Sequence, residues 1–467
     1  MGRLTAPVLA EVSSRSPRLI PVLTLGAPFG ESYSGVALDD GYVNEFGEYR
    51  LMLPLVTEWS SIPYSVPYRA GGLQPVEASV KLRDVTEATP IGVLPNYLGR
   101  KFSSYNCRRA TATIEWVPTT GAYDPTTAQR IFTGVLDRWS FSRGVWTLYL
   151  RTDDRPLQGR IPALPAFAKQ AWPNIPQSSV GIYPQIVYGE WNSSAVTGQG
   201  ALKCPFVDYA AGVSSWAYMS YGRIVGASAC YVNDVSRGAI GGNWGQAHVF
   251  RDGRWHTIVV FTSSFPNPAT DRVTVDCKGL TSIWDGTGTL LTNPVEVLKH
   301  ILANLVYASW NGGTYNPDSV APLDTTTLAS LSTFAVQRLY EATRKIGGTT
   351  KQETALSIVE SWLSAHKAFR LYWNMGGKLA GGTITPIYPG YWNGNEPQLV
   401  RPEDDMTPGT SLERFQDVQS VASQISGSYL PDDSKGQLSA SLDVQDPSIT
   451  PKIVQSLQHD WSAARLT

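Results

Sequence analysis

Charged side chains are scarce in this chain of 467 residues. Asp, Glu, Lys and Arg make up 16% of the sequence, whereas roughly 25% is usual in soluble domains. Lys plus Arg number 38 against 39 for Asp plus Glu, a net charge of −1. A protein that reads duplex DNA needs a basic footprint for its phosphate contacts, so sequence-specific nucleic-acid binding is not expected. Low charge density fits either a β-rich globular protein or one buried among partners.

Cysteines and long apolar runs are also few. The four cysteines contain no CxxC pair, so neither a zinc nor a redox motif is predicted. Cys277 shares one face of a strand-like segment with Val273 and Val275, which predicts a buried thiol, and the cysteines are expected to be reduced. No stretch of about 18 apolar residues occurs, and residues 1–20 lack the apolar centre of a signal peptide. Neither a membrane span nor secretion is therefore expected.

Residue patterns that carry catalysis are missing. No HExxH or GxSxG pattern occurs, and the glycine pairs lack the Lys-Ser/Thr of a P-loop. Adjacent acids such as Asp153-Asp154 could serve a glycosidase, but in Gly/Pro-rich sequence they are more typical of turns and helix caps. His300 and His366 fall within or late in predicted helices, where the dipole favours a cationic side chain. No catalytic, cofactor-binding or metal-binding residue is predicted, and the chain is not expected to be an enzyme.

Aromatic residues are abundant instead, with 15 Trp and 22 Tyr. Exposed aromatic rings stack on sugars, so Trp191, Trp216, Trp244 and Trp255 raise the hypothesis of carbohydrate binding. Trp and Tyr are also typical of protein cores and interfaces. That second interpretation is the favoured one.

Alternation with a period of two dominates the first third of the chain. Residues 131–141 and 146–151 alternate on both sides of Ser142-Arg143-Gly144, and a glycine can adopt the positive φ of a tight turn, so a β-hairpin is predicted. Strands at this spacing, with Gly and Pro between them, indicate a barrel or sandwich. Two further strands are predicted because apolar residues occupy every second position and so share one face. One strand carries Val76, Ala78, Val80 and Leu82, and the other carries Ala110, Ala112, Ile114 and Trp116.

The periodicity becomes helical near residue 293. Asn293-Pro294-Val295-Glu296 has the residue order of a helix N-terminus, and Thr350-Lys351-Gln352-Glu353 marks a second start. A short hairpin is expected between residues 369–373 and 378–380, and residues 450–466 are expected to form a closing helix. Before this region, the sequence predicts a hairpin turning at residues 251–254.

Together these patterns predict a mainly β fold with an α+β insert. The predicted parts are an N-terminal arm (1–41), a first β-barrel (42–165), a Pro-rich connector (166–184), a second β-rich domain (185–290), an α/β domain (291–380) and a C-terminal segment (381–467).

Several sequence motifs occur in a fixed order between Leu51 and Leu379. They are FTGVL at 132–136 with GVWTLYL at 144–150, LQGRIP at 157–162, PQIVYG at 184–189, VTVDCKG at 273–279 before the helix NPVEVLKHIL, and the run from Thr354 to Leu379 that ends in GGKL. In this order they resemble the baseplate hub (tail tip) proteins of long-tailed bacteriophages and gene-transfer-agent-like particles.

The resemblance implies a homotrimer in which each subunit contributes two tail-tube-like β-barrels. Three subunits would present a pseudo-sixfold ring to a hexameric tail tube and would close or guide the DNA ejection channel. The second barrel would be discontinuous, combining part of residues 185–290 with residues 381–467. Implied partners are a distal tail or tail-tube protein hexamer, the tape-measure protein and central fibre or tip proteins. The implied location is the virion tail tip, assembled in the host cytoplasm.

Two alternative functions stay open. One is a carbohydrate-binding or cell-wall-degrading tail-tip protein, which requires exposed tryptophans in the second β region. The other is a distal tail or tube-adaptor protein, which would be hexameric and would lack the α/β region at residues 293–379. Because the chain stops at Thr467, the fibre-bearing domains of longer hub proteins are expected to be absent or on another polypeptide.

Overall fold

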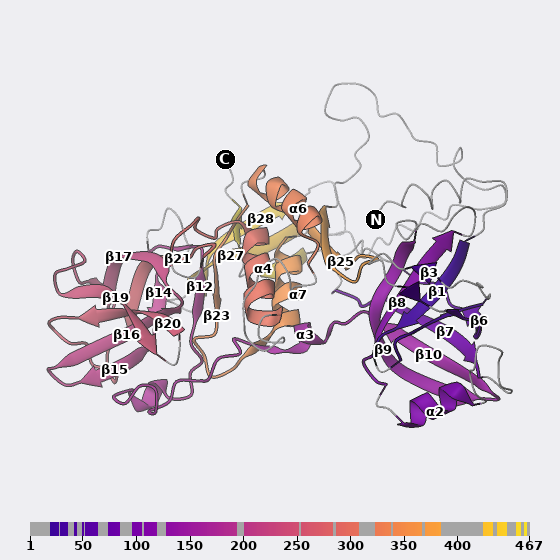
Figure 1. Cartoon of the computed structure of the whole chain (residues 1–467). Coiled ribbons are helices and arrows are strands. Elements are labelled where there is room, and N and C mark those ends of the chain that lie inside the picture. The colour runs from indigo at the N-terminus through magenta and orange to yellow at the C-terminus, as the bar shows by residue number, and fades with distance from the viewer. Residues whose placement is uncertain are drawn as a thin grey trace, which may run out of the picture. The chain divides into compact units, whose positions relative to one another are not determined.

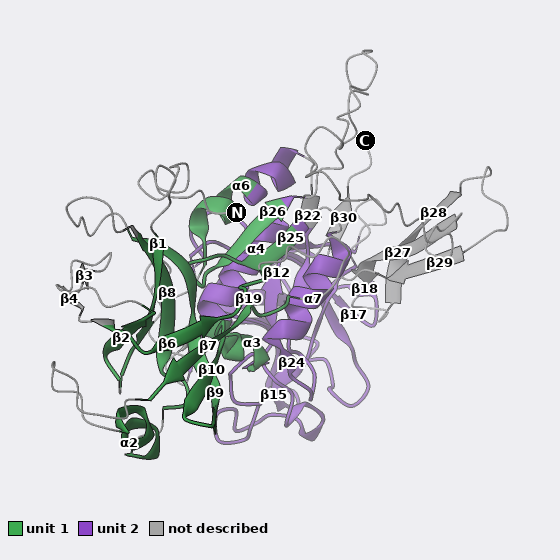
Figure 2. Ribbon diagram, turned by 90° about the vertical axis from the view of Figure 1, so that its right-hand side faces the viewer, with its two compact units in different colours: residues 1–159, 306–330, 370–382 green, residues 160–305, 331–369, 383–467 purple. Residues whose placement is uncertain are grey.

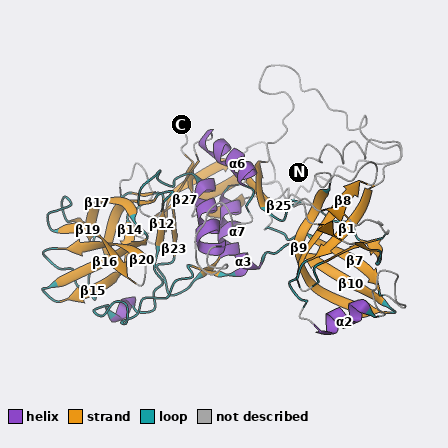
Figure 3. Cartoon of the chain, in the orientation of Figure 1, coloured by secondary structure: helices purple, strands orange, loops and turns teal. Residues whose placement is uncertain are grey.

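The protein forms two compact units, each rich in strands, in a computed structural model (Figure 1). Antiparallel sheets and a few helices make up both units (Figure 3), which confirms the predicted mainly β class. The structure describes residues 19–27, 29–35, 42–43, 49–50, 52–63, 73–84, 96–104, 107–118, 128–193, 200–251, 254–283, 286–307, 323–337, 340–366, 369–383, 424–432, 437–445, 454–458 and 462–464. Unit 1 comprises residues 1–159, 306–330 and 370–382, and unit 2 comprises residues 160–305, 331–369 and 383–467 (Figure 2).

An eight-stranded sheet forms the centre of unit 1, in the order β5-β2-β1-β8-β9-β10-β7-β6. Residues 19–34, assigned from the sequence to the arm, supply two of its strands. Pro21 is tolerated there because β2 begins to pair with β1 only at Val22. The elements are β1 Leu19–Leu25, β2 Glu31–Ser34, β3 Tyr42–Val43, β4 Tyr49–Arg50, β5 Met52–Leu53, β6 Val56–Trp59, β7 Glu77–Arg83, α2 Tyr97–Ser104, β8 Thr111–Pro118, β9 Gln129–Ser142, β10 Val145–Arg151 and α3 Arg155–Gln158.

The two ends of this sheet belong to one short segment of chain. β5 pairs with β2 at one edge, β6 pairs with β7 at the other, and both strands lie within residues 52–59. A side chain at Gly35, directly after β2, would place its Cβ 3.4 Å from the Val56 carbonyl oxygen, so the edges also come within contact. In the described part of unit 1 no ladder joins β5 to β6. The sheet is therefore curled and closed through the chain, and is not a barrel closed by hydrogen bonds.

The predicted hairpin at residues 130–151 is confirmed. β9 and β10 pair from Ser142↔Val145 onward, and the turn residues Arg143 (φ 52°) and Gly144 (φ 79°) both have positive φ. Two positive φ angles give a turn whose twist matches that of the flanking strands.

The sequence predicts that Ala112, Ile114 and Trp116 lie on one buried face of β8, and this prediction is wrong for Trp116. A register shift between Ile114 and Glu115 exchanges the two faces, so Glu115 and Val117 are buried while Trp116 is half-buried. The buried Glu115 carboxylate forms an ion pair with Arg130 at 3.3 Å. An irregularity of one residue is invisible to a pattern with a period of two.

Unit 2 contains two facing sheets and a helical part. One sheet has the order β15-β16-β20-β19, and the other has β13-β21-β17-β18 with β14 also on β21. Its elements are β11 Arg160–Ile161, η2 Gln177–Ser179, β12 Ile186–Tyr188, β13 Glu190–Trp191, β14 Leu202–Cys204, β15 Phe206–Ala210, β16 Ser214–Tyr221, β17 Ile224–Val232, β18 Val235–Ser236, β19 Trp244–Arg251, β20 Arg254–Phe261, β21 Val273–Leu280, α4 Pro294–Ile301, β22 Tyr340–Ala342, β23 Arg344–Ile346, β24 Glu353–Thr354 and α7 Ala355–Ala365.

The chain passes from one sheet of unit 2 to the other at Pro205. β14 ends at Cys204 and pairs with β21, whereas β15 starts at Phe206 and pairs with β16. The Tyr218 N–H donates to the Pro205 carbonyl at 2.7 Å, which continues the second ladder through the proline. The predicted hairpin at 251–254 is confirmed, since β19 and β20 pair up to Arg251↔Arg254.

The Pro-rich segment at 166–184 contains no strand but supplies part of the core. Phe167, Trp172 and Ile175 are buried against a cluster from the first sheet of unit 2. The cluster consists of Val207, Tyr218 and Ile258. The segment therefore covers one face of that sheet.

Both predicted helices of the α/β part exist. Asn293 caps α4 by accepting the Val295 N–H at 2.9 Å, as its sequence predicts. The cap of α7 is Thr354, which accepts the Ser357 N–H at 3.1 Å, so the predicted start at Thr350 is wrong by one turn. Residues 353–354 first pair with β11, and the helix can begin only after that ladder ends.

The remaining elements are η3 Leu302–Tyr307, α6 Thr325–Gln337, β25 Phe369–Trp373, β26 Leu379–Thr383, β27 Gln424–Asp432, β28 Gln437–Gln445, β29 Val454–Gln458 and β30 Ser462–Ala464. β25 and β26 form the predicted hairpin. The closing helix predicted for residues 450–466 is wrong, because β29 pairs with β27 and β30 pairs with β22. Pairing with distant segments overrides a weak local preference for helix. Of the helices in the described residues, none is long and apolar enough to cross a bilayer.

Candidate interaction surfaces and the junction at residues 183–191

The segment from Tyr183 to Trp191, which contains the PQIVYG motif, joins the two parts of unit 2. Towards the sheets, the Gln185 side-chain amide donates to the carbonyls of Tyr218 (3.0 Å) and Met219 (2.8 Å). The Val187 N–H donates to Ser220 Oγ at 3.2 Å. These contacts are buried, so each satisfies a polar group that water cannot reach.

The same segment binds the helical part on its other side. β12 pairs with β23 from Ile186↔Ile346 to Tyr188↔Arg344. The Gly189 N–H donates to the Leu291 carbonyl at 3.1 Å, two residues before the cap of α4. One short strand therefore sets the position of α4 relative to the two sheets.

The glycines of two sequence motifs meet in this junction. The Gly279 N–H donates to the Gly189 carbonyl at 2.8 Å. Gly189 has a φ of 79°, and a side chain there would collide with the Ala342 carbonyl. A Cβ at Gly279 would lie 2.5 Å from the Val187 carbonyl oxygen. Close approach of backbones is thus the physical reason for a glycine in each motif.

His300 is held neutral in the core next to this junction. The Tyr188 hydroxyl lies 3.0 Å from His300 Nδ1, and both side chains are buried. Burial lowers the pKa of His300 to about 4. The expectation of a cationic histidine near the helix end is therefore wrong, because the cost of burying the charge exceeds the benefit of the dipole. His366 is also buried, with Nδ1 at 2.9 Å from the Trp362 carbonyl oxygen.

In unit 1, aromatic rings extend from the core to the tip of the β9–β10 hairpin. Phe102 of α2 stacks on Trp146 with centroids 4.6 Å apart, and Trp146 contacts Phe141 at 4.7 Å. Phe141 is 55% exposed. Asp84 fixes the start of α2 by accepting the N–H groups of Leu98 (3.0 Å) and Gly99 (2.9 Å). The hairpin tip is thus a supported apolar surface.

The four tryptophans proposed for sugar stacking have different environments. Trp191 and Trp244 are buried, and Trp216 is half-buried. Trp255 is 38% exposed, but the Arg223 guanidinium lies 3.8 Å from the centre of its ring. A buried ring cannot stack on a sugar, so Trp244 is a core residue, as the favoured interpretation predicts.

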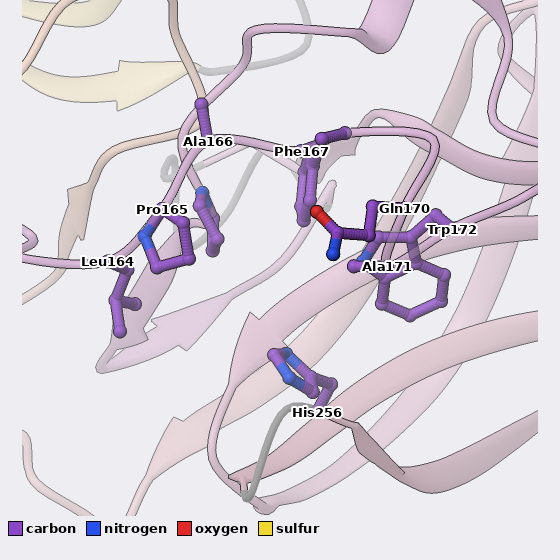
Figure 4. Close-up of a pocket in the computed structure, with 10 residues that line it drawn as sticks. Leu164, Pro165, Ala166, Phe167, Gln170, Ala171, Trp172 and His256 are labelled. Carbon is purple, nitrogen blue, oxygen red and sulfur yellow. The ribbon is translucent and has the colours of Figure 1, made fainter.

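A cavity of about 380 Å³ opens between the Pro-rich segment and β20. Its walls are mostly apolar, and Figure 4 shows His256 across the cavity from Phe167 and Gln170. The His256 ring has a partner on each nitrogen, with Nδ1 at 2.8 Å from the Tyr218 hydroxyl and Nε2 at 3.3 Å from the Arg251 carbonyl oxygen. The cavity is therefore an apolar recess in which both nitrogens of His256 already have hydrogen-bond partners within the protein.

The acids and cysteines have structural environments where the structure describes them. Asp153 pairs with Arg155, and Asp154 pairs with Arg151 at 2.8 Å, at the start of α3. Adjacent acids also occur in the sequence at 39–40 and 403–405, and these lie outside the described residues. No disulfide joins the four cysteines, and all four are buried. Burial raises the pKa of Cys230 to about 12 and also raises the pKa of Cys277. Within the described ranges no group of three potential ligands could hold a metal ion.

Comparison with known proteins gives distant structural likenesses only. No protein-family profile and no curated protein matches the chain. A protein in the virion of a native gene transfer agent particle aligns over 58% of this chain and 84% of its own, with 15% identity and a TM-score of 0.25. The 43 kDa tail protein of prophage MuSo2 from Shewanella oneidensis aligns over 95% and 73%, with 8% identity and a TM-score of 0.31. TM-scores this low do not establish a shared fold.

Replacing Gly279 with alanine should destabilise unit 2. The new Cβ would meet backbone at Val187, which cannot rotate away as a side chain could. We expect the free energy of unfolding in urea to fall by about 1–3 kcal/mol. The matched control is Gly245→Ala in β19, where a Cβ meets nothing within 4 Å and the change should stay within about 0.5 kcal/mol. Equal effects of the two substitutions would contradict the close approach.

His300 should make the folded state less stable in mild acid. The unfolded chain binds a proton near the ordinary histidine pKa, whereas folded His300 binds one only near pH 4, so stability falls as pH drops through this window. Between pH 7.5 and 5 the wild type should lose on the order of 2 kcal/mol more than His300→Gln, which does not titrate. Urea unfolding at both pH values measures this difference. Parallel pH dependence of the two proteins would show that His300 is not held neutral.

Proposed function

We propose that the chain is a structural virion protein of a phage-type tail, specifically the baseplate hub at its distal end. Three copies would form a ring that adapts a hexameric tail tube to the tip and closes or guides the DNA channel. In this proposal the chain catalyses no reaction, and residues 381–467 complete a second barrel. Its neighbours would be a distal tail or tail-tube protein, the tape-measure protein and tip proteins.

One observation carries the proposal. The motifs that resemble hub proteins become successive structural elements whose joints depend on the motif residues. The hairpin turns at Arg143-Gly144, and two motif glycines hydrogen-bond to each other between β12 and β21. Motifs that met only by chance would have no reason to interlock in this way.

The low charge density agrees with a ring component. A subunit stacked between other rings buries much of its surface, and an unpaired charge in such an interface is costly. The chain has 16% charged residues and a net charge of −1. The supported apolar tip of the β9–β10 hairpin is the kind of surface that a neighbouring subunit covers.

Two observations bear on the alternatives. The α4 and α7 region, which a distal tail or tube-adaptor protein would lack, is present. The sugar-binding alternative loses Trp191 and Trp244, since both are buried. The hub is therefore the function that the described residues support best.

Subunit counting tests the proposal. Native mass spectrometry of the full chain, or imaging of the particle along its long axis, should give three copies. Six copies would favour the tube adaptor instead. A monomer that binds host polysaccharide, with binding that survives Trp244→Ala but not Trp255→Ala, would replace the structural role by sugar binding.

A further inference from the structure

The tip of the β19–β20 hairpin in unit 2 presents two aromatic rings to solvent. Phe250 and Trp255 face each other across the ladder with ring centroids 5.2 Å apart. They are 59% and 38% exposed, respectively. Further along the same face, the paired Trp244 and Phe261 are buried. The same face of the hairpin is therefore buried at the end that carries Trp244 and Phe261, and is apolar and exposed at the tip.

A cation accompanies the two rings. The Arg223 guanidinium lies 3.8 Å from the centre of the Trp255 ring. Its Nε atom is buried without a hydrogen-bond partner, and in the described residues no carboxylate forms an ion pair with it. His248 lies on the same face, two residues before Phe250, and its pKa is lowered first by burial and then by the charge of Arg223. The surface thus combines exposed aromatic rings with a positive charge that has no ion-pair partner among the residues that the structure describes.

This combination fits a carboxylate better than a sugar. Stacking on a sugar needs a free ring face, whereas Arg223 covers Trp255 and Phe250 packs against its ring. A guanidinium held over an aromatic ring still has N–H donors with which to bind a carboxylate. Trp and Arg are also the residues that dominate binding energy in protein interfaces.

We propose that Arg223, His248, Phe250 and Trp255 form a docking surface for a protein segment that carries a carboxylate beside apolar side chains. The carboxylate binds Arg223, and the apolar side chains cover Phe250 and the exposed part of Trp255. Charge complementarity and the exposed parts of the two rings select this partner. The inference concerns unit 2 alone and holds whether or not the chain is a tail hub.

A random 12-residue peptide library, displayed and selected against the full-length chain, provides the probe. We expect enrichment of sequences with Asp or Glu next to Leu, Phe or similar residues. The best sequence is then synthesised with its acid and with the amide in its place. Calorimetry should show at least a tenfold loss of affinity for Arg223→Gln, and an equal loss when the peptide acid becomes the amide.

The double change should cost little more than either single change, because both remove the same pair. The matched control is Arg272→Gln, an arginine of the same unit that already pairs with Asp234 at 2.6 Å, and it should leave affinity unchanged. Phe250→Ser, at the exposed tip, should weaken binding without lowering the urea midpoint, so the proposal stays testable if Arg223→Gln folds poorly.

Three outcomes would overturn the proposal. They are selection of peptides without acids, affinity that is insensitive to both Arg223→Gln and Phe250→Ser, and no enrichment at all. Polygalacturonate binding that Phe250→Ser abolishes, in the absence of peptide binding, would reassign the surface to an anionic polysaccharide.

Discussion

The architecture of unit 2 depends on one short backbone segment, residues 183–191, whose hydrogen bonds point in two directions. Towards the sheets it engages β16 through Gln185 and Val187, and towards the helical part it pairs with β23 and holds the residues before α4. A strand buried on both sides has no water to satisfy its polar groups, so each N–H and C=O needs a fixed partner. This requirement removes the freedom of the sheets and helices to shift independently.

Such a junction also constrains which residues can surround it. Backbones that approach this closely leave no room for a Cβ, which fixes glycine at positions 189 and 279. The aromatic and imidazole rings of Tyr188 and His300 fill the adjacent core, and their hydrogen bond permits burial only while the imidazole is neutral. Geometry, packing and protonation are therefore aspects of one constraint, and a change in any of them acts on the whole of unit 2.

The sequence predicts local structure well here and long-range closure poorly. The hairpin at Arg143-Gly144 and the cap at Asn293 follow from a few adjacent residues, whose φ preferences and side-chain acceptors act within one turn. The curling of the first sheet through residues 52–59, the change of sheet at Pro205 and the strands at 454–464 depend on partners far away in the chain. Nothing in their local pattern specifies those partners. The docking surface of Arg223, His248, Phe250 and Trp255 is likewise not predictable from the local sequence, because its residues come from β19, β20 and the turn before β17.

Two hairpins, one in each unit, end in an exposed phenylalanine backed by a tryptophan: Phe141 on Trp146, and Phe250 on Trp255. A phenylalanine that is more than half exposed contributes little to the stability of its own fold. Its supporting tryptophan nevertheless restricts the ring, so less conformational entropy remains to be lost when a partner covers it. A rigid, exposed ring is better suited to association than a mobile one.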